Sequence, residues 1–115
     1  MPLDPQAVID HTASTWDDAI IPALVDYIRV PALSVGFDPR WAEHGHLDAV
    51  VDDALAWVQG RAVTGLRAEV VRLPGLTPVL WFEVPAFGDG APDGTVLLYG
   101  HLDKQPEMTG WAPGL

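Results

Sequence analysis

The sequence predicts an α/β fold in which two amino-terminal helices pack on a mixed β-sheet. Three observations indicate this class. Apolar residues recur at helical spacing in two separate segments, two runs of β-forming residues flank a Pro-Gly turn, and a third apolar run shows no alternation. The order helix, helix, strand, strand, strand favours a layered α/β domain over a bundle or a sandwich. A chain of 115 residues is long enough for one such domain with a hydrophobic core.

The first helix is predicted between Trp16 and Val30, because apolar residues recur there every three or four positions while aspartates occupy the opposite side. Pro22 lies inside this pattern. It lacks an amide hydrogen and crowds the preceding turn, so it must either kink the helix or begin its more regular half. Pro31 is expected to end the helix, and the segment 32–46, which carries glycines and prolines but no period, is expected to be a connection with local turns.

The second helix is predicted to begin at Leu47 and to end by Gly65, a candidate left-handed cap. Aspartates occupy the side of this helix opposite its apolar face. Asp52 and Asp53 therefore indicate a solvated helix face rather than a catalytic carboxylate pair.

Three strands are expected after the helices. Charged residues interrupt the β-formers of segment 66–73, which is typical of a sheet edge, and Pro74-Gly75 turns the chain into an antiparallel partner at 79–84. Segment 85–94 is rich in glycine and proline and is expected to be a surface loop. The uninterrupted apolar run Val96–Tyr99, fenced by glycines, predicts a central strand that is covered on both faces.

Composition excludes several classes of function. Six Lys and Arg against sixteen Asp and Glu give a formal charge of −10, which repels nucleic acid and anionic membrane surfaces. The chain has no cysteine, so any metal must be held by histidine and carboxylate. No stretch approaches the length of a membrane span, and the amino terminus lacks the pattern of a signal peptide. These features predict a soluble, cytoplasmic protein without nucleic-acid or membrane partners.

The candidate site follows the third predicted strand. Ligands of open α/β sheets bind just beyond the carboxyl ends of central strands, and His101 lies at that position after Gly100. A neutral imidazole is a good zinc ligand, and its second nitrogen usually needs a hydrogen-bond acceptor. Asp103, two residues on, could serve His101 or another ligand histidine. The following loop contains Trp111, whose position in the loop gives it a functional interpretation. This hypothesis requires His101 to be fixed at the end of an interior strand.

Other histidines and tryptophans have simpler interpretations. His44 and His46 are separated by a glycine just before the second helix, where capping or surface roles are favoured over metal binding. Core or interface positions are expected for three tryptophans: Trp16, Trp57 and Trp81.

The run Val96–Glu107, VLLYGHLDKQPE, followed by Gly110-Trp111, resembles the first metal-site motif of a family of co-catalytic zinc metallopeptidases. That family includes carnosine dipeptidases, aminoacylases, succinyl-diaminopimelate desuccinylase and glutamate carboxypeptidases. The segments Tyr27–Ser34 and Pro78–Leu80 also resemble its amino-terminal region, so the resemblance covers most of the chain. Its most specific element is Leu98–Asp103, and the dipeptidase-like branch is the most similar one.

The resemblance implies that His101 binds one of two zinc ions and that Asp103, the candidate catalytic-site residue, orients a metal-site imidazole. Manganese or cobalt could replace zinc in such a site. The family's bridging aspartate, catalytic glutamate and other metal ligands have no counterpart in residues 1–115, and neither does its dimerisation domain. The resemblance therefore implies that residues 1–115 are the amino-terminal portion of a catalytic domain, inactive alone, from a homodimeric parent that hydrolyses amide bonds of dipeptides or N-acyl amino acids.

Simple coordination chemistry leads to the same expectation, because a hydrolytic zinc centre needs about three protein ligands, an open position for water and a general base. Two other classes remain open. The chain could be a non-catalytic α/β binding or interaction module that works through its acidic surface. Another metallohydrolase class is disfavoured because the H-x-H-x-D-H cluster typical of it is absent from the sequence.

Overall fold

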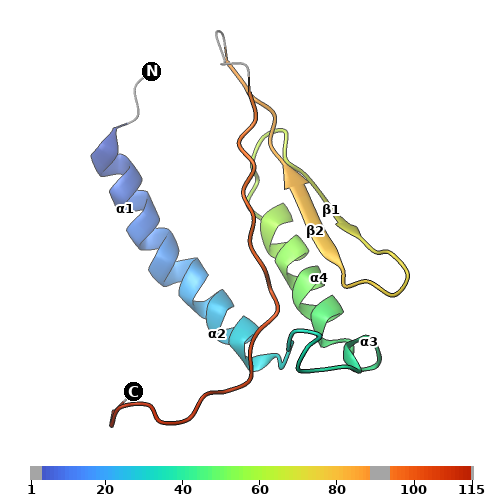
Figure 1. Ribbon diagram of the computed structural model, residues 1–115. Helices are drawn as coiled ribbons and strands as arrows, with labels where there is room; N and C mark the ends of the chain where they lie inside the picture. Colours follow the sequence, from blue (N-terminus) through green and yellow to red (C-terminus); the bar gives the residue numbers. More distant parts are fainter. Residues whose placement is uncertain (1–3, 89–93, 115) are drawn as a thin grey trace. The chain divides into compact units, whose positions relative to one another are not determined.

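A computed structural model describes residues 4–88 and 94–114 of the chain. It contains helices and a small antiparallel sheet, which agrees with a mixed α/β composition (Figure 1). The chain divides into two compact units, Met1–Pro31 and Ala32–Leu115. Over the described ranges, no helix combines the length and the apolar character needed to cross a membrane.

The first unit is helical from Pro5 to Arg29, a longer helical segment than the one predicted from Trp16 onwards. Helix α1 covers Pro5–Thr15, and it begins early because Asp4 accepts a hydrogen bond from the backbone N–H of Gln6 at 3.0 Å. Proline at the first helical position has its backbone angle already set for a helix. The apolar period begins later than these capping signals, which is why periodicity alone missed α1.

A π-helical turn, Trp16–Ile20, joins α1 to α2, which covers Ile21–Arg29. Pro22 cannot donate the backbone hydrogen bond that an α-helix would use at this position, and the widened turn lies directly before it. Of the two alternatives predicted for Pro22, a kink or the start of the more regular half of the helix, the second agrees with its position at the start of α2. The helix ends before Pro31, also as predicted. None of the described residues of this unit is buried.

The second unit is built on α4, His46–Gln59, which follows the short helix α3, Trp41–His44. Gly45 separates the two helices with φ of +71°, a value that favours glycine. Helix α4 is the second predicted helix, and it ends at Gln59, before Gly65 as predicted. Gly65 does not cap it but lies in the turn before the first strand. Among the residues that the structure describes, the buried core consists of four: Ala32, Leu47, Val50 and Val51.

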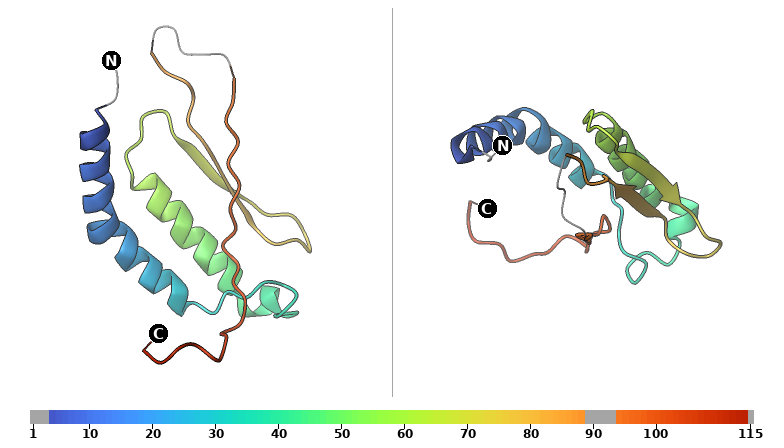
Figure 2. Two further views of the ribbon diagram at one scale, coloured as in Figure 1. Left: turned by 60° about the vertical axis from the view of Figure 1, so that its left-hand side comes forward. Right: turned by 90° about the horizontal axis from the view of Figure 1, so that it is seen from above.

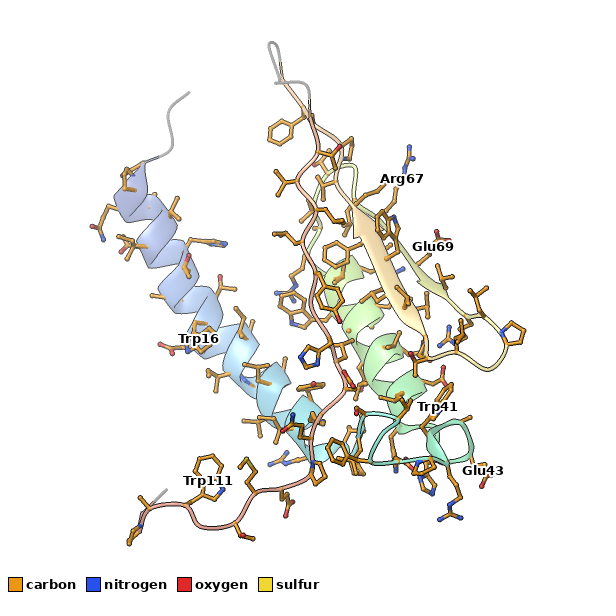
Figure 3. All side chains as sticks on the ribbon, in the orientation of Figure 1. Trp16, Trp41, Glu43, Arg67, Glu69 and Trp111 are labelled. Atoms are coloured by element: carbon orange, nitrogen blue, oxygen red, sulfur yellow. The ribbon has the colours of Figure 1, made fainter. Side chains whose placement is uncertain are left out.

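A β-hairpin packs on α4, as the views in Figures 1 and 2 agree. Strand β1, Arg67–Val71, pairs antiparallel with β2, Val79–Glu83, so the predicted hairpin is confirmed. Burial alternates along β1, where the charged side chains Arg67 and Glu69 lie on the side turned away from α4 (Figure 3). This alternation explains why charges and β-formers interleave in its sequence.

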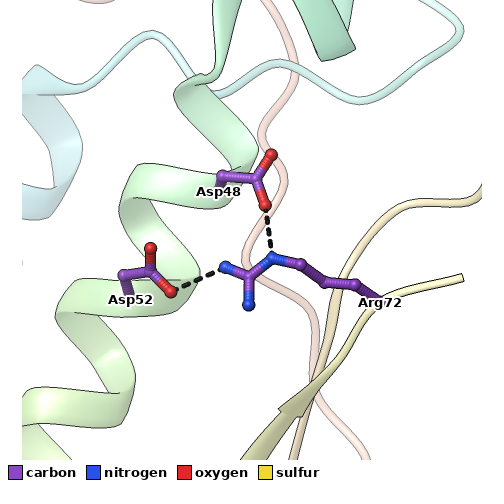
Figure 4. Close-up of polar contacts among 3 residues, drawn as sticks. All are labelled: Asp48, Asp52 and Arg72. Carbon is purple, nitrogen blue, oxygen red and sulfur yellow. Dashed lines mark hydrogen bonds and ion pairs between the residues drawn. The ribbon is translucent and has the colours of Figure 1, made fainter.

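A cluster of ion pairs connects Arg72, the residue after β1, to α4. The Arg72 guanidinium donates from Nε to Asp48 at 2.9 Å and from an Nη atom to Asp52 at 2.7 Å (Figure 4). Asp52 first and Asp48 second raise the pKa of Arg72 through these hydrogen bonds. Asp52 is exposed, as the solvated-face interpretation predicted, and it has a structural partner as well.

The prediction of a third strand at Val96–Tyr99 is wrong for the described part of the chain. Val96–Tyr99 belongs to no strand, and its side chains are exposed rather than covered on both faces. The sheet is therefore two-stranded and antiparallel instead of mixed. Part of the predicted loop, 89–93, lies outside the described residues. Core or interface positions were expected for three tryptophans: Trp16, Trp57 and Trp81. All three are exposed, so none belongs to the core, which is aliphatic among the described residues.

Candidate functional site

A pair of backbone hydrogen bonds positions the candidate site. The N–H of Lys104 donates to the carbonyl of Ala32 at 2.9 Å, and the N–H of Ser34 donates to the carbonyl of Lys104 at 2.9 Å. Together these bonds form an isolated parallel bridge between Leu33 and Lys104. Ala32 is fully buried, so the segment that carries the site is anchored beside the core.

His101 lies three residues before this anchor and folds back on Asp103. Its Nδ1 atom is 3.1 Å from the backbone carbonyl oxygen of Asp103 and 3.0 Å from the carboxylate Oδ1 of the same residue. A carbonyl oxygen can only accept a hydrogen bond, so Nδ1 must carry the proton. In the neutral imidazole this leaves the lone pair on Nε2, the nitrogen that is then able to bind a metal ion.

The same geometry defines the part that Asp103 can play. Its carboxylate is engaged by Nδ1, on the opposite side of the ring from the free lone pair. It therefore holds the tautomer and the orientation of the imidazole, and it does not act as a second ligand to an ion bound at Nε2. The His101 side chain is 70% exposed and that of Asp103 is 37% exposed, so solvent reaches both.

The secondary structure around His101 differs from the prediction. His101 was expected at the carboxyl end of an interior strand, but the residues before it form no strand in the described structure. The ring is thus held by a local contact and by the nearby backbone bridge, not by a sheet. A central strand needs paired neighbours on both edges, and no described segment provides them for Val96–Tyr99.

The described residues do not form a metal centre by themselves. No group of three or more histidine, aspartate or glutamate side chains among them could hold a metal ion. One imidazole, oriented by one carboxylate, fits a single ligand position of a zinc site. Chemically this arrangement can donate one nitrogen ligand, and it lacks the further ligands and the general base that hydrolysis requires.

Two residues near the site have identifiable structural surroundings. Burial lowers the pKa of the Lys104 ammonium group, since desolvation disfavours the charged form. Sequence reasoning missed Lys104 and its partners because their contribution comes from backbone atoms, which carry no residue-specific signal. Trp111 donates from Nε1 to the carbonyl of Met108 at 2.9 Å, so it closes a local turn of the loop that follows the site.

The second histidine pair also has a structural explanation. His44 Nδ1 lies 2.8 Å from the carboxylate Oδ2 of Asp38, whose other oxygen accepts from the backbone N–H of Arg40. The hydrogen bond from His44 is the main cause that lowers the pKa of Asp38. His46 lies nearby, with ring centroids 5.9 Å apart. These contacts stabilise the connection before α4. His44 lies on the surface, one of the two roles expected for the pair, and no side chain caps the start of α4.

Comparison with known proteins adds no assignment: no protein-family model matches the chain, and no curated protein sequence matches it significantly.

Proposed function

We propose that this chain is the amino-terminal portion of the catalytic domain of a zinc-dependent metallopeptidase that hydrolyses amide bonds of dipeptides or N-acyl amino acids. One observation carries the proposal. His101 and Asp103 form an imidazole–carboxylate pair in which Nδ1 is hydrogen-bonded and Nε2 is left with the lone pair. The pair lies within the segment whose sequence resembles the metal-site motif of this enzyme family.

In this proposal each residue has a limited task. Nε2 of His101 would bind one of two zinc ions, with manganese or cobalt as possible substitutes, and Asp103 would keep the imidazole in the required tautomer. When bound, zinc supplies Lewis acidity toward the amide carbonyl and lowers the pKa of a bound water. The remaining ligands and the general base would come from further segments of the enzyme, and a homodimer is the expected assembly. Residues 1–115 alone are therefore expected to be inactive.

The isolated chain gives the first test. We expect no dipeptide hydrolysis with zinc or manganese, and only weak zinc binding, because one imidazole lacks chelating partners. Turnover by highly purified chain that disappears in His101→Ala would contradict the assignment of an incomplete site.

The gene product that contains this chain gives the decisive test. It should hydrolyse a dipeptide or an N-acyl amino acid in a zinc-dependent way. His101→Ala should remove bound zinc and activity, whereas Asp103→Ala should lower metal affinity or activity roughly 10- to 100-fold. His11→Ala, a change at an exposed histidine of α1, serves as the matched control and should have no effect. A product that binds no zinc and hydrolyses neither substrate class would refute the proposal and favour the acidic interaction module.

A further inference from the structure

The turn that leads from Ala32 to α3 is organised around one carboxylate, that of Asp38. The Asp38 side chain is only 12% exposed. Its Oδ1 atom accepts a hydrogen bond from the backbone N–H of Arg40 at 3.1 Å, and its Oδ2 atom lies 2.8 Å from Nδ1 of His44. A carboxylate that is largely covered is costly to desolvate unless its oxygens have partners. Asp38 therefore stabilises one specific conformation of this turn.

The backbone of the same turn holds the segment that carries His101. The N–H of Asp38 donates to the carbonyl of Ser34 at 3.0 Å, and the carbonyl of Asp38 accepts from the N–H of Trp41 at 3.1 Å. Ser34 in turn donates its own N–H to the carbonyl of Lys104 at 2.9 Å, which is half of the bridge near His101. Figures 1 and 2 both show the trace of this segment crossing the connection that leads to α3. A continuous set of hydrogen bonds thus links the Asp38 turn to the anchor of the candidate ligand.

The bridge is short, so the backbone conformation on each side of it matters. The residues before His101 form no strand in the described structure, so no sheet holds the imidazole in place. The Ala32 end of the bridge is fixed by burial in the core. The Ser34 end is fixed by the turn that Asp38 stabilises. Loss of the Asp38 carboxylate is therefore expected to loosen one end of the bridge and leave the core in place.

We propose that Asp38 is a positioning residue for His101. Its carboxylate fixes the turn whose Ser34 amide holds the Lys104 carbonyl, and this in turn fixes where the imidazole lies. The inference rests on the proposed metallopeptidase function only for its consequence, which is the zinc affinity of Nε2 of His101. Asp38 acts through backbone atoms and needs no contact with a metal ion or a substrate.

Amide hydrogen exchange of the 115-residue chain tests this coupling without any metal. In the unmodified chain the Ser34 and Lys104 amides should be protected. Asp38→Ala removes both acceptor oxygens, so it should accelerate exchange of these two amides about tenfold more than exchange of the Val51 amide in α4. Asp38→Asn keeps an acceptor for the Arg40 N–H and should have a smaller effect than Asp38→Ala.

Two control substitutions separate this local effect from general destabilisation. Val50→Ala weakens the core, and it should accelerate exchange of the Val51 amide at least as much as exchange of the Lys104 amide. Glu43→Ala removes the same charge from an exposed residue of α3 and should leave both amides unchanged. Equal acceleration of the Ser34, Lys104 and Val51 amides in Asp38→Ala would overturn the proposal, because Asp38 would then stabilise the unit as a whole. Free exchange of the Ser34 and Lys104 amides in the unmodified chain would also overturn it.

Zinc titration of the gene product that contains this chain tests the consequence for His101. Asp38→Ala should lower zinc affinity roughly tenfold, the lower end of the range found when a residue that supports a metal ligand is lost. Glu43→Ala should leave zinc affinity unchanged. Unchanged affinity in Asp38→Ala would overturn the positioning of His101. A gene product that binds no zinc would refute the proposed function instead, and the exchange measurement would still decide whether Asp38 holds the bridge.

Discussion

The small core of the second unit makes its stability depend strongly on single side chains, and Val50→Ala is the most informative perturbation. Val50 is 2% exposed and belongs to the buried set that also contains Ala32. Removing two methylene equivalents costs about 1.6 kcal/mol of transfer free energy. A residual cavity of about 50 Å³ adds about 1 kcal/mol. The higher helix propensity of alanine returns about 0.6 kcal/mol, which leaves a net loss of about 2 kcal/mol in the free energy of unfolding.

Thermal unfolding followed by circular dichroism measures this loss, which corresponds to a fall in Tm of roughly 10 °C for a unit of this size. The loss in the free energy of unfolding should also weaken the protection of the backbone bridge at the candidate site, because the Lys104 amide donates to the carbonyl of buried Ala32. Where exchange of that amide requires unfolding of the unit, it should accelerate roughly thirtyfold. Val25→Ala in α2 is the matched control, since Val25 is 42% exposed and gains the same helix propensity without losing core contacts. Equal melting of Val50→Ala and Val25→Ala would refute the assignment of the core.

Three further substitutions test individual contacts. Arg72→Met should lower the Tm, and the loss should shrink in about 1 M salt, where the Debye length is about 3 Å. The carboxylate of Asp38 has a pKa below the ordinary 3.8, so its stabilising effect is present above that value and is lost as the pH falls through the lowered one. Asp38→Asn should therefore destabilise the protein near neutral pH and flatten the pH dependence of unfolding below about pH 4; an unchanged acid limb would contradict this. Gly65→Ala should destabilise more than Gly75→Ala in urea titrations: both glycines have positive φ, but only at Gly65 would a Cβ lie 3.1 Å from the ring of Pro85.

The local elements could be predicted because their signals lie within the segments themselves. The apolar period of α4, the turn at Pro74-Gly75 and the effect of Pro22 each depend on neighbouring residues, and the structure confirms all three. The start of α1 was also encoded locally, in Asp4 and its following proline, but as a capping signal rather than an apolar period.

The candidate site likewise combines a contact that the sequence could predict with one that it could not. His101 and Asp103 are two residues apart, so their contact is a local event, and it is one of the two roles that the sequence left open for Asp103. The anchor at Lys104 pairs with backbone atoms of Ala32 and Ser34, and no residue pattern announces such a bridge. Whether these residues hold a metal ion stays a prediction.

The sequence by itself determined where helices, turns and β-forming runs lie, because backbone preference and side-chain period act over a few residues. Only the tertiary structure decided that Val96–Tyr99 remains outside the sheet and exposed. An apolar run shows that a segment can be covered on both faces, but the covering must come from paired strands and packed helices. In the described structure those partners are absent around residues 96–99, and a strand without an edge to pair with is only an extended chain.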